Sequence, residues 1–159
     1  MTKNDAILVD TNVLLLLLVG AVGVNYLARH KRTARYDGQA YVIARQYISR
    51  FPTVLTTPHV LAETANLLSG GLNGSALQQV WEAFRTLCGR FDERHVPIHT
   101  LVREETLRRL GVTDTGIIRL SGRGWVVLTD DLPLFVALQE RNLSAVNFTH
   151  LRLAAAGNR

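Results

Sequence analysis

Short apolar segments alternate with longer segments of helical periodicity along this chain. Ala6–Val9 is continuously apolar, which is typical of a strand buried on both faces of a parallel sheet. Strands that alternate with helices need crossover connections, and these place helices on both faces of the sheet. We therefore expect an α/β fold, a three-layer α/β/α sandwich around a mostly parallel central sheet. The expected strands are Ala6–Val9, Thr53–Thr56, Pro97–His99, Trp125–Leu128 and Ser144–Phe148.

Capping signals place several of the intervening helices. Thr57-Pro58 is typical of a helix start, with threonine as N-cap and proline at the first helical position, and Gly70-Gly71 ends that helix. Val102–Leu110 is predicted as a charged surface helix in which Glu104–Arg108 and Glu105–Arg109 have the spacing of ion pairs. Either Thr113 or Asp114 is expected to cap the next helix. Further helices are expected over residues 13–27, 38–50, 73–88 and 132–141, with a short one from residue 149.

The length and the single cysteine limit the possible classes of protein. A chain of 159 residues suits one domain, here expected to span residues 1–159 with a basic insertion at about residues 29–50. With Cys88 as the only cysteine, no intrachain disulfide is possible, so a reducing cytoplasm is expected. The apolar run Val13–Val24 is shorter than the ~20 residues that a membrane span needs, so we expect a buried helix and no membrane partner. A secretory signal is the less favoured alternative.

The charge balance favours a polyanionic partner. Lys and Arg number 18 against 13 Asp and Glu, and the isoelectric point is about 10. Such a surplus attracts nucleic acid by long-range electrostatics and counterion release. Part of it lies in the basic stretch Arg29–Arg45, for which three interpretations remain. It is an arm that contacts nucleic acid, a surface on which a partner protein docks, or a solvated insertion; the last is slightly favoured.

Four acidic residues lie far apart in sequence but at the ends or starts of expected elements: Asp10, Glu63, Asp114 and Asp131. Asp10 and Asp131 follow strands, and the carboxyl ends of parallel strands meet at one crevice, where open α/β sheets bind ligands. Carboxylates gathered there repel one another, which implies a divalent cation. Three of them also have an ordinary structural interpretation. Asp10 and Asp114 suit helix N-caps, although Asn12 could cap in place of Asp10, and Glu63 suits a surface position.

The donor set indicates the metal and the reaction. Carboxylate oxygens without cysteine favour Mg²⁺ or Mn²⁺ over Zn²⁺, and such ions promote phosphodiester hydrolysis by in-line attack of water. Thr129 is placed to hydrogen-bond a carboxylate or a water molecule there. Because Asp130 and Asp131 are adjacent, at most one is expected to face the crevice, and spacing favours Asp131. His59 is a possible extra ligand, but a partly buried structural histidine is the favoured interpretation.

Four segments resemble the motifs of the PIN-domain nucleases, in order and over most of the chain. They are Ile7–Leu14, Thr57–Asn66, Thr113–Ile118 and Val127–Asp131. The resemblance implies an α/β/α sandwich and an endoribonuclease, often the toxin of a toxin–antitoxin pair and often a homodimer. It also implies that Asp10, Glu63, Asp114 and Asp131 bind Mg²⁺ or Mn²⁺, with Asn12 and Thr129 in support. The residues expected to attract the RNA backbone are Arg29, Lys31, Arg32, Arg35 and Arg123.

Two other functions are compatible with the pattern. The first is a PIN-like fold without catalysis, which binds RNA or serves as a scaffold. The second is a phosphatase of the haloacid dehalogenase type, which also places an aspartate after its first strand. That chemistry requires a second aspartate two residues later, where this chain has Asn12, and a lysine, for which only Lys3 and Lys31 are available. It therefore ranks third.

Overall fold

The computed structural model describes residues 5–157, and a five-stranded sheet lies at the centre of this part of the chain. All neighbouring strands are parallel, in the order β3-β2-β1-β4-β5. The expected α/β fold with a parallel central sheet is therefore confirmed. The strands are β1 (Ala6–Val9), β2 (Thr53–Thr56), β3 (Asp92–Glu93), β4 (Val126–Thr129) and β5 (Ala145–Asn147).

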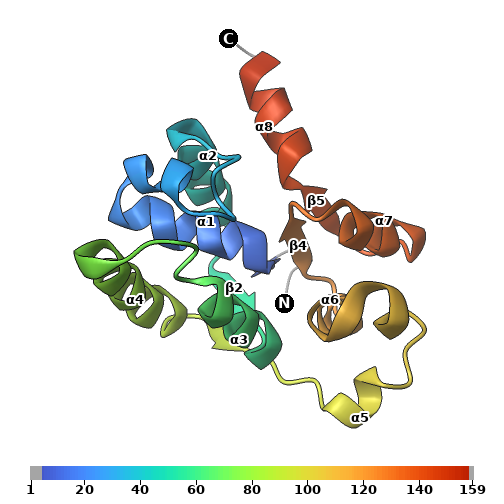
Figure 1. The fold of residues 1–159 in the computed structure, drawn as a ribbon. Coiled ribbons are helices and arrows are strands. Elements are labelled where there is room, and N and C mark those ends of the chain that lie inside the picture. The colour runs from blue at the N-terminus through green and yellow to red at the C-terminus, as the bar shows by residue number, and fades with distance from the viewer. Residues whose placement is uncertain (1–4, 158–159) are drawn as a thin grey trace.

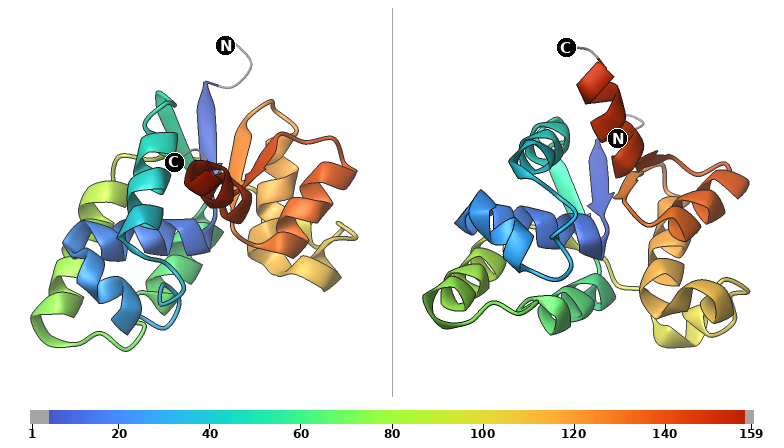
Figure 2. Two further views of the ribbon diagram at one scale, coloured as in Figure 1. Left: turned by 90° about the horizontal axis from the view of Figure 1, so that it is seen from above. Right: turned by 45° about the horizontal axis from the view of Figure 1, so that its top comes forward.

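Helices cover the sheet on both sides and make the three layers of the sandwich (Figures 1 and 2). One side carries α1 (Thr11–Val22), the 3-10 helix η1 (Val24–Arg29), α2 (Gly38–Ile48), α3 (Pro58–Leu67) and α4 (Gly74–Cys88). The other side carries α5 (Ile98–Leu101), α6 (Leu107–Ser121) and α7 (Leu132–Glu140). The last helix, α8 (Phe148–Gly157), follows β5 and projects from the body beyond α2. The topology thus sends the chain from β1 to one side and from β4 to the other.

The core is built around β1 and α1. Every residue of β1 is buried, and so is each residue of α1 from Val13 to Val19, which explains why this helix is apolar on all sides. It ends at Val22, earlier than the expected Leu27, and the 3-10 helix continues the chain. At 12 residues α1 is too short to cross a bilayer, and no other helix within residues 5–157 is long and apolar enough to do so.

The expected strand Pro97–His99 is wrong. The strand in this region is β3, Asp92–Glu93, which pairs with the end of β2. Residues 98–101 form the single helical turn α5. A two-residue, charged edge strand has no apolar pattern by which it could be recognised. Its partner strand supplies the hydrogen bonds that define it.

The expected helix Val102–Leu110 and the cap at Thr113 or Asp114 are also wrong. Helix α6 begins at Leu107 and continues to Ser121 across a break at Gly111, whose φ of 81° is open to glycine and strained for other residues. Because residues 102–106 are not helical, the predicted ion pairs do not form. Glu104 instead lies 3.7 Å from Arg119, and Arg109 lies 3.7 Å from Glu140. The break sets Asp114 in the first turn after the kink, inside the helix.

Candidate functional site

The candidate site lies at the carboxyl ends of β1 and β4, the two neighbouring strands from which the chain leaves toward opposite faces of the sheet. Strands β1 and β4 are adjacent, with Val9 paired to Leu128, and the chain leaves them toward opposite layers. Asp10 directly follows β1. Thr129 is the last residue of β4, and Asp130 and Asp131 follow that strand. Open α/β sheets bind their ligands at such a switch point because the diverging connections leave a crevice there. The topology therefore places Asp10 and Asp131 at one edge, as the sequence predicts.

Asp10 is fixed by hydrogen bonds to both of its carboxylate oxygens. The Val13 amide donates to Oδ1 at 2.8 Å, which makes Asp10 the N-cap of α1, and the Asp130 amide donates to Oδ2 at 3.0 Å. The Thr129 hydroxyl donates to the same Oδ2, in keeping with its expected support of a carboxylate. Of the two residues that could cap α1, Asp10 does so and Asn12 does not, because Asp10 has the extended backbone of a cap and Asn12 lies inside the helix.

Burial makes the charge on Asp10 costly. Its side chain is almost fully enclosed, and this desolvation raises the pKa of Asp10 to about 6, although the three hydrogen bonds oppose the shift. The neighbouring charge of Asp130 adds a smaller upward contribution to that pKa. Asp10 is thus a rigid carboxylate whose charged form would be strongly stabilised by a nearby positive charge.

The adjacent aspartates after β4 have different surroundings. Asp130 is buried and accepts hydrogen bonds from the Tyr36 and Thr149 hydroxyls, each at 2.6 Å, with the Arg35 guanidinium 3.3 Å away. Asp131 accepts only the Leu134 amide, at 2.8 Å, as the N-cap of α7. Its backbone amide donates to the Thr129 hydroxyl at 3.0 Å. Asp130 is therefore engaged in tying the layers together, whereas Asp131 keeps one carboxylate oxygen without a described partner.

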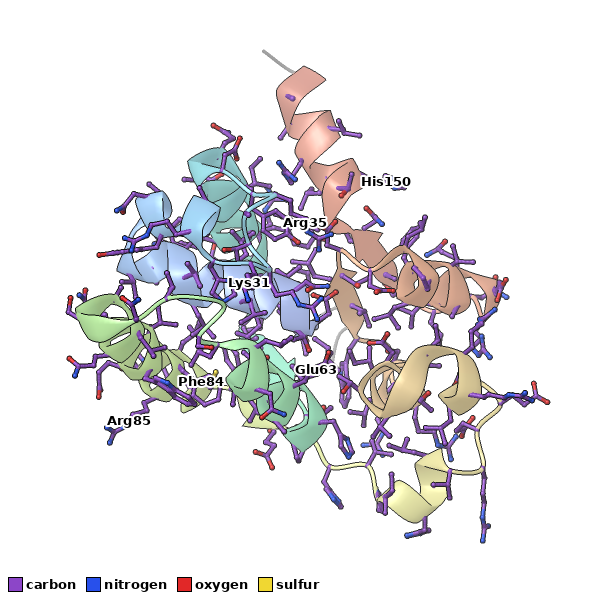
Figure 3. The ribbon with its side chains drawn as sticks, viewed as in Figure 1. Lys31, Arg35, Glu63, Phe84, Arg85 and His150 are labelled. Carbon is purple, nitrogen blue, oxygen red and sulfur yellow. The ribbon has the colours of Figure 1, made fainter. Side chains whose placement is uncertain are left out.

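The two helical acids face the strand-end acids. The pKa of Asp114 is raised to about 7, mostly by burial and then by the charges of Asp131, Asp10 and Glu63, in this order of size. Asp114 and Glu63 accept no hydrogen bond within residues 5–157. Figure 3 shows Glu63 on α3, directed toward the centre of the molecule. Asp131, Asp10 and Glu63 therefore each lie within electrostatic reach of Asp114.

This arrangement falls short of a closed metal cage. Within the part of the chain that the structure describes, no group of three or more His, Cys, Asp or Glu side chains is arranged to hold a metal ion. Mg²⁺ commonly takes only one or two protein carboxylates and fills its shell with water and substrate phosphate. The donor set, all oxygen with raised pKa values at Asp10 and Asp114, suits such an ion. The four-ligand cluster stays a prediction.

Cations of the basic stretch line a cavity that includes Asp131. A cavity of about 500 Å³ is bounded by Asn12, Lys31, Arg32, Arg35, Asp130, Asp131 and Leu132. Figure 3 shows Lys31 and Arg35 near this central edge. Two predicted RNA contacts do not line this cavity. Arg29 stacks on the Tyr26 ring. Arg123 stacks on Trp125, just before the start of β4, and so lies at the amino-terminal end of the strand.

His30 is a buried residue near the candidate site that the sequence did not predict. The ring is completely buried, with Nε2 3.1 Å from the Leu67 carbonyl and 3.2 Å from that of Leu68, while the Arg32 amide donates to Nδ1. Nε2 must therefore carry the proton and donate, and burial lowers the pKa of His30. No local motif marks this residue, because its partners lie at the end of α3. His59, on α3, is half-buried, and its ring faces Gly116 on α6. Its Nδ1 has no hydrogen bond within residues 5–157.

Comparison with known proteins adds no relative: no family model matches the chain, and no curated protein matches it either.

Proposed function

We propose that this protein is a Mg²⁺- or Mn²⁺-dependent endoribonuclease of the PIN type, acting in the cytoplasm. The observation that carries the proposal is the electrostatic coupling of Asp114 to Asp131, Asp10 and Glu63 at the switch point of the sheet. Buried like charges destabilise a fold unless something neutralises them, and perturbed pKa values in a crevice are typical of functional sites. The adjoining cations supply the complementary attraction for a phosphate backbone.

Each residue then has a distinct role. Asp131 and Asp114 would hold the cation, because Asp131 keeps an oxygen without a described partner and Asp114 has no competing hydrogen bond. The bound ion would supply charge neutralisation at the phosphate and activation of water. Asp10, fixed by Thr129, completes the negative field, and Glu63 orients the water. Without a cation the pKa of Asp114 is about 7, and a bound cation would lower that pKa and keep the carboxylate in its charged form.

The decisive experiment is cleavage of a defined single-stranded RNA with Mg²⁺, Mn²⁺ or EDTA. Wild type should cleave with either ion and leave 5′-phosphate ends. Asp114→Asn should reduce the rate by about 10²–10³-fold while the protein stays folded. Glu82→Gln is the matched control, since Glu82 lies on the outer face of α4 beside Arg85 and should have no effect. Cleavage that persists in EDTA and in Asp114→Asn would refute the proposal.

One observation favours a second candidate, an RNA-binding protein without catalysis. Within residues 5–157 no three acidic or histidine side chains are arranged as a metal site. This candidate predicts salt-sensitive RNA binding without turnover in any metal, so the same assay distinguishes the two. A phosphatase of the haloacid dehalogenase type is less favoured, since this chain has Asn12 where that chemistry requires a second aspartate. The proposal that a partner antitoxin restrains the enzyme, and that it forms a homodimer, rests on the family resemblance alone.

A further inference from the structure

The basic stretch after η1 has a regular pattern of burial. His30, Thr33 and Tyr36 are buried, with exposures of 0%, 0% and 4%. The residues between them, Lys31, Arg32, Ala34 and Arg35, are exposed. A spacing of three residues thus directs one side of the segment into the protein and leaves its cations at the surface. A solvated insertion has no need of such regular anchoring.

Each buried residue is anchored to a different part of the fold. His30 donates to the carbonyls that end α3, and the Lys31 amide donates to the Gly70 carbonyl at 2.8 Å. The Thr33 hydroxyl donates to the Leu27 carbonyl at 2.9 Å. The Tyr36 hydroxyl donates to Asp130 beside the candidate site. The segment is therefore fastened at its start, middle and end.

Gly70 shows how closely the first anchor fits. A Cβ at this position would lie only 2.1 Å from Nε2 of His30, and its φ of 47° is itself strained for other residues. Gly71, with a φ of 97°, has far more room: a Cβ there would meet nothing closer than the Lys31 side chain at 3.8 Å. The ring of His30 thus occupies the space that the missing side chain of Gly70 leaves.

Two of the exposed cations remain available. Arg35 forms an ion pair with buried Asp130, whereas Lys31 and Arg32 have no ion pair within residues 5–157. Both line the cavity that also contains Asp131. Two unpaired cations therefore stand beside the carboxylates at a position that the anchors determine.

We propose that residues 30–36 form a preorganised arm that binds the RNA backbone next to the acidic edge, with Lys31 and Arg32 as phosphate contacts and His30 as the positioning residue. This rests on the proposed function for the identity of the ligand. Fixing the arm before binding reduces the entropy that association must overcome. It also directs the cations at phosphates on one side of the carboxylates.

Binding measured in EDTA tests the arm separately from catalysis. The probe is a fluorescein-labelled single-stranded RNA whose anisotropy is followed over a range of salt concentrations. Lys31→Gln with Arg32→Gln should weaken binding about 10-fold or more and reduce the salt slope by about 1.4, at roughly 0.7 per lost contact. The matched control is Arg85→Gln with Arg90→Gln, because Arg85 points away from the site on α4 (Figure 3) and Arg90 is exposed just after the end of that helix. The control should keep the wild-type slope to within about 0.3.

A double-mutant cycle separates positioning by His30 from general stabilisation. His30→Ala should weaken RNA binding about 3- to 10-fold in the wild type and have no further effect once Lys31 and Arg32 are replaced. Val80→Ala, which removes buried volume in α4, supplies a loss of stability without touching the arm and should leave RNA affinity unchanged. If His30→Ala fails to fold, Gly70→Ala replaces it, with Gly71→Ala as its control.

Three outcomes would overturn the inference: wild type that does not bind the RNA, unchanged affinity in the Lys31 and Arg32 variant, or an equal loss from His30→Ala in both backgrounds. An active enzyme with an indifferent arm would refute the arm alone. Specific binding without cleavage would refute the proposed catalysis and leave the arm in place.

Discussion

The acids at the strand ends and the acids on the helices are held in different ways. Asp10 and Asp131 are helix caps that follow β1 and β4, and hydrogen bonds fix their orientation. Glu63 and Asp114 accept no hydrogen bond within the described range and owe their positions to α3 and α6 alone. Capping stabilises a helix whatever the protein does, so Asp10 and Asp131 have a structural reason to be acidic.

The helical acids therefore carry more information about function. Asp114 is partly buried beside like charges, and its pKa, raised to about 7, means that its charged form destabilises the fold at neutral pH. No hydrogen bond described for it offsets this cost. A residue that destabilises its own fold is best explained by a ligand that the charge attracts. The comparison predicts that strand-end acids contribute to both stability and function, and helical acids to function alone.

The largest expected effect separates the two aspartates after β4. Asp131→Asn should lower RNA cleavage by about 10²–10³-fold, because it removes a charge that faces Asp114. Asp130→Asn should lower it less than about 5-fold, because Asp130 is directed to Tyr36, Thr149 and Arg35. Initial rates at saturating metal measure both. If Asp130→Asn lowers the cleavage rate more than Asp131→Asn does, then Asp130 and not Asp131 is the functional aspartate.

The next effect concerns the structural role of Asp10. At pH 5, where Asp10 is mostly protonated, Asp10→Ala should lower the free energy of unfolding by about 2–3 kcal/mol, because it leaves buried donors of Val13, Thr129 and Asp130 without their acceptor. At pH 8 the loss should be smaller, since the wild type then carries a buried charge that alanine removes. Urea unfolding in EDTA gives both values. Equal losses at the two pH values would show that Asp10 pays no charge penalty.

Most of the central sheet was predictable because burial leaves a local trace. β1, β2 and β4 have short apolar runs, and α3 has a threonine cap followed by proline, so the strand ends that position Asp10 and Asp131 followed directly. Where the pattern was polar, prediction was wrong. β3 consists of Asp92–Glu93, and the helix expected from Val102 begins only at Leu107.

The contacts that complete the site were beyond prediction because they join distant residues. Tyr36 and Asp130 are 94 residues apart, and His30 reaches carbonyls 37 and 38 residues later. Neither spacing repeats with a helical or strand period, so nothing local encodes it. The placement of Asp10 and Asp131 after neighbouring strands was predictable; which acids would be occupied by hydrogen bonds required the packed structure.

The charge on Asp114 should produce a smaller effect of opposite sign. Because the folded-state pKa values of Asp114 and Asp10 are raised to about 7 and about 6, the wild type in EDTA should lose stability as pH rises from 4 to 8. Asp114→Asn should raise the free energy of unfolding at pH 8 by about 1–2 kcal/mol, allowing for partial solvent screening, and change little at pH 4. Thermal unfolding at the two pH values measures this, with Glu82→Gln as control.

The same measurement with metal adds a direct test of cation binding. Mg²⁺ should stabilise the wild type at pH 8 and stabilise Asp114→Asn much less, because one of the charges that attract it is gone. Asp114→Asn that is destabilised at pH 8 would mean that this carboxylate, like Asp10, has a structural partner. The contrast between helical and strand-end acids would then fail.

The smallest effect isolates capping from charge at Asp131. Asparagine keeps a side-chain oxygen that can accept the Leu134 amide, whereas alanine does not. Asp131→Asn should therefore retain wild-type stability to within a few tenths of a kcal/mol, and Asp131→Ala should lose about 1 kcal/mol. Both should be equally poor in cleavage, since both lack the charge. If Asp131→Asn cleaves RNA and Asp131→Ala does not, capping of α7 matters more for cleavage than the negative charge does. The strand-end acids would then contribute to function by stabilising the fold.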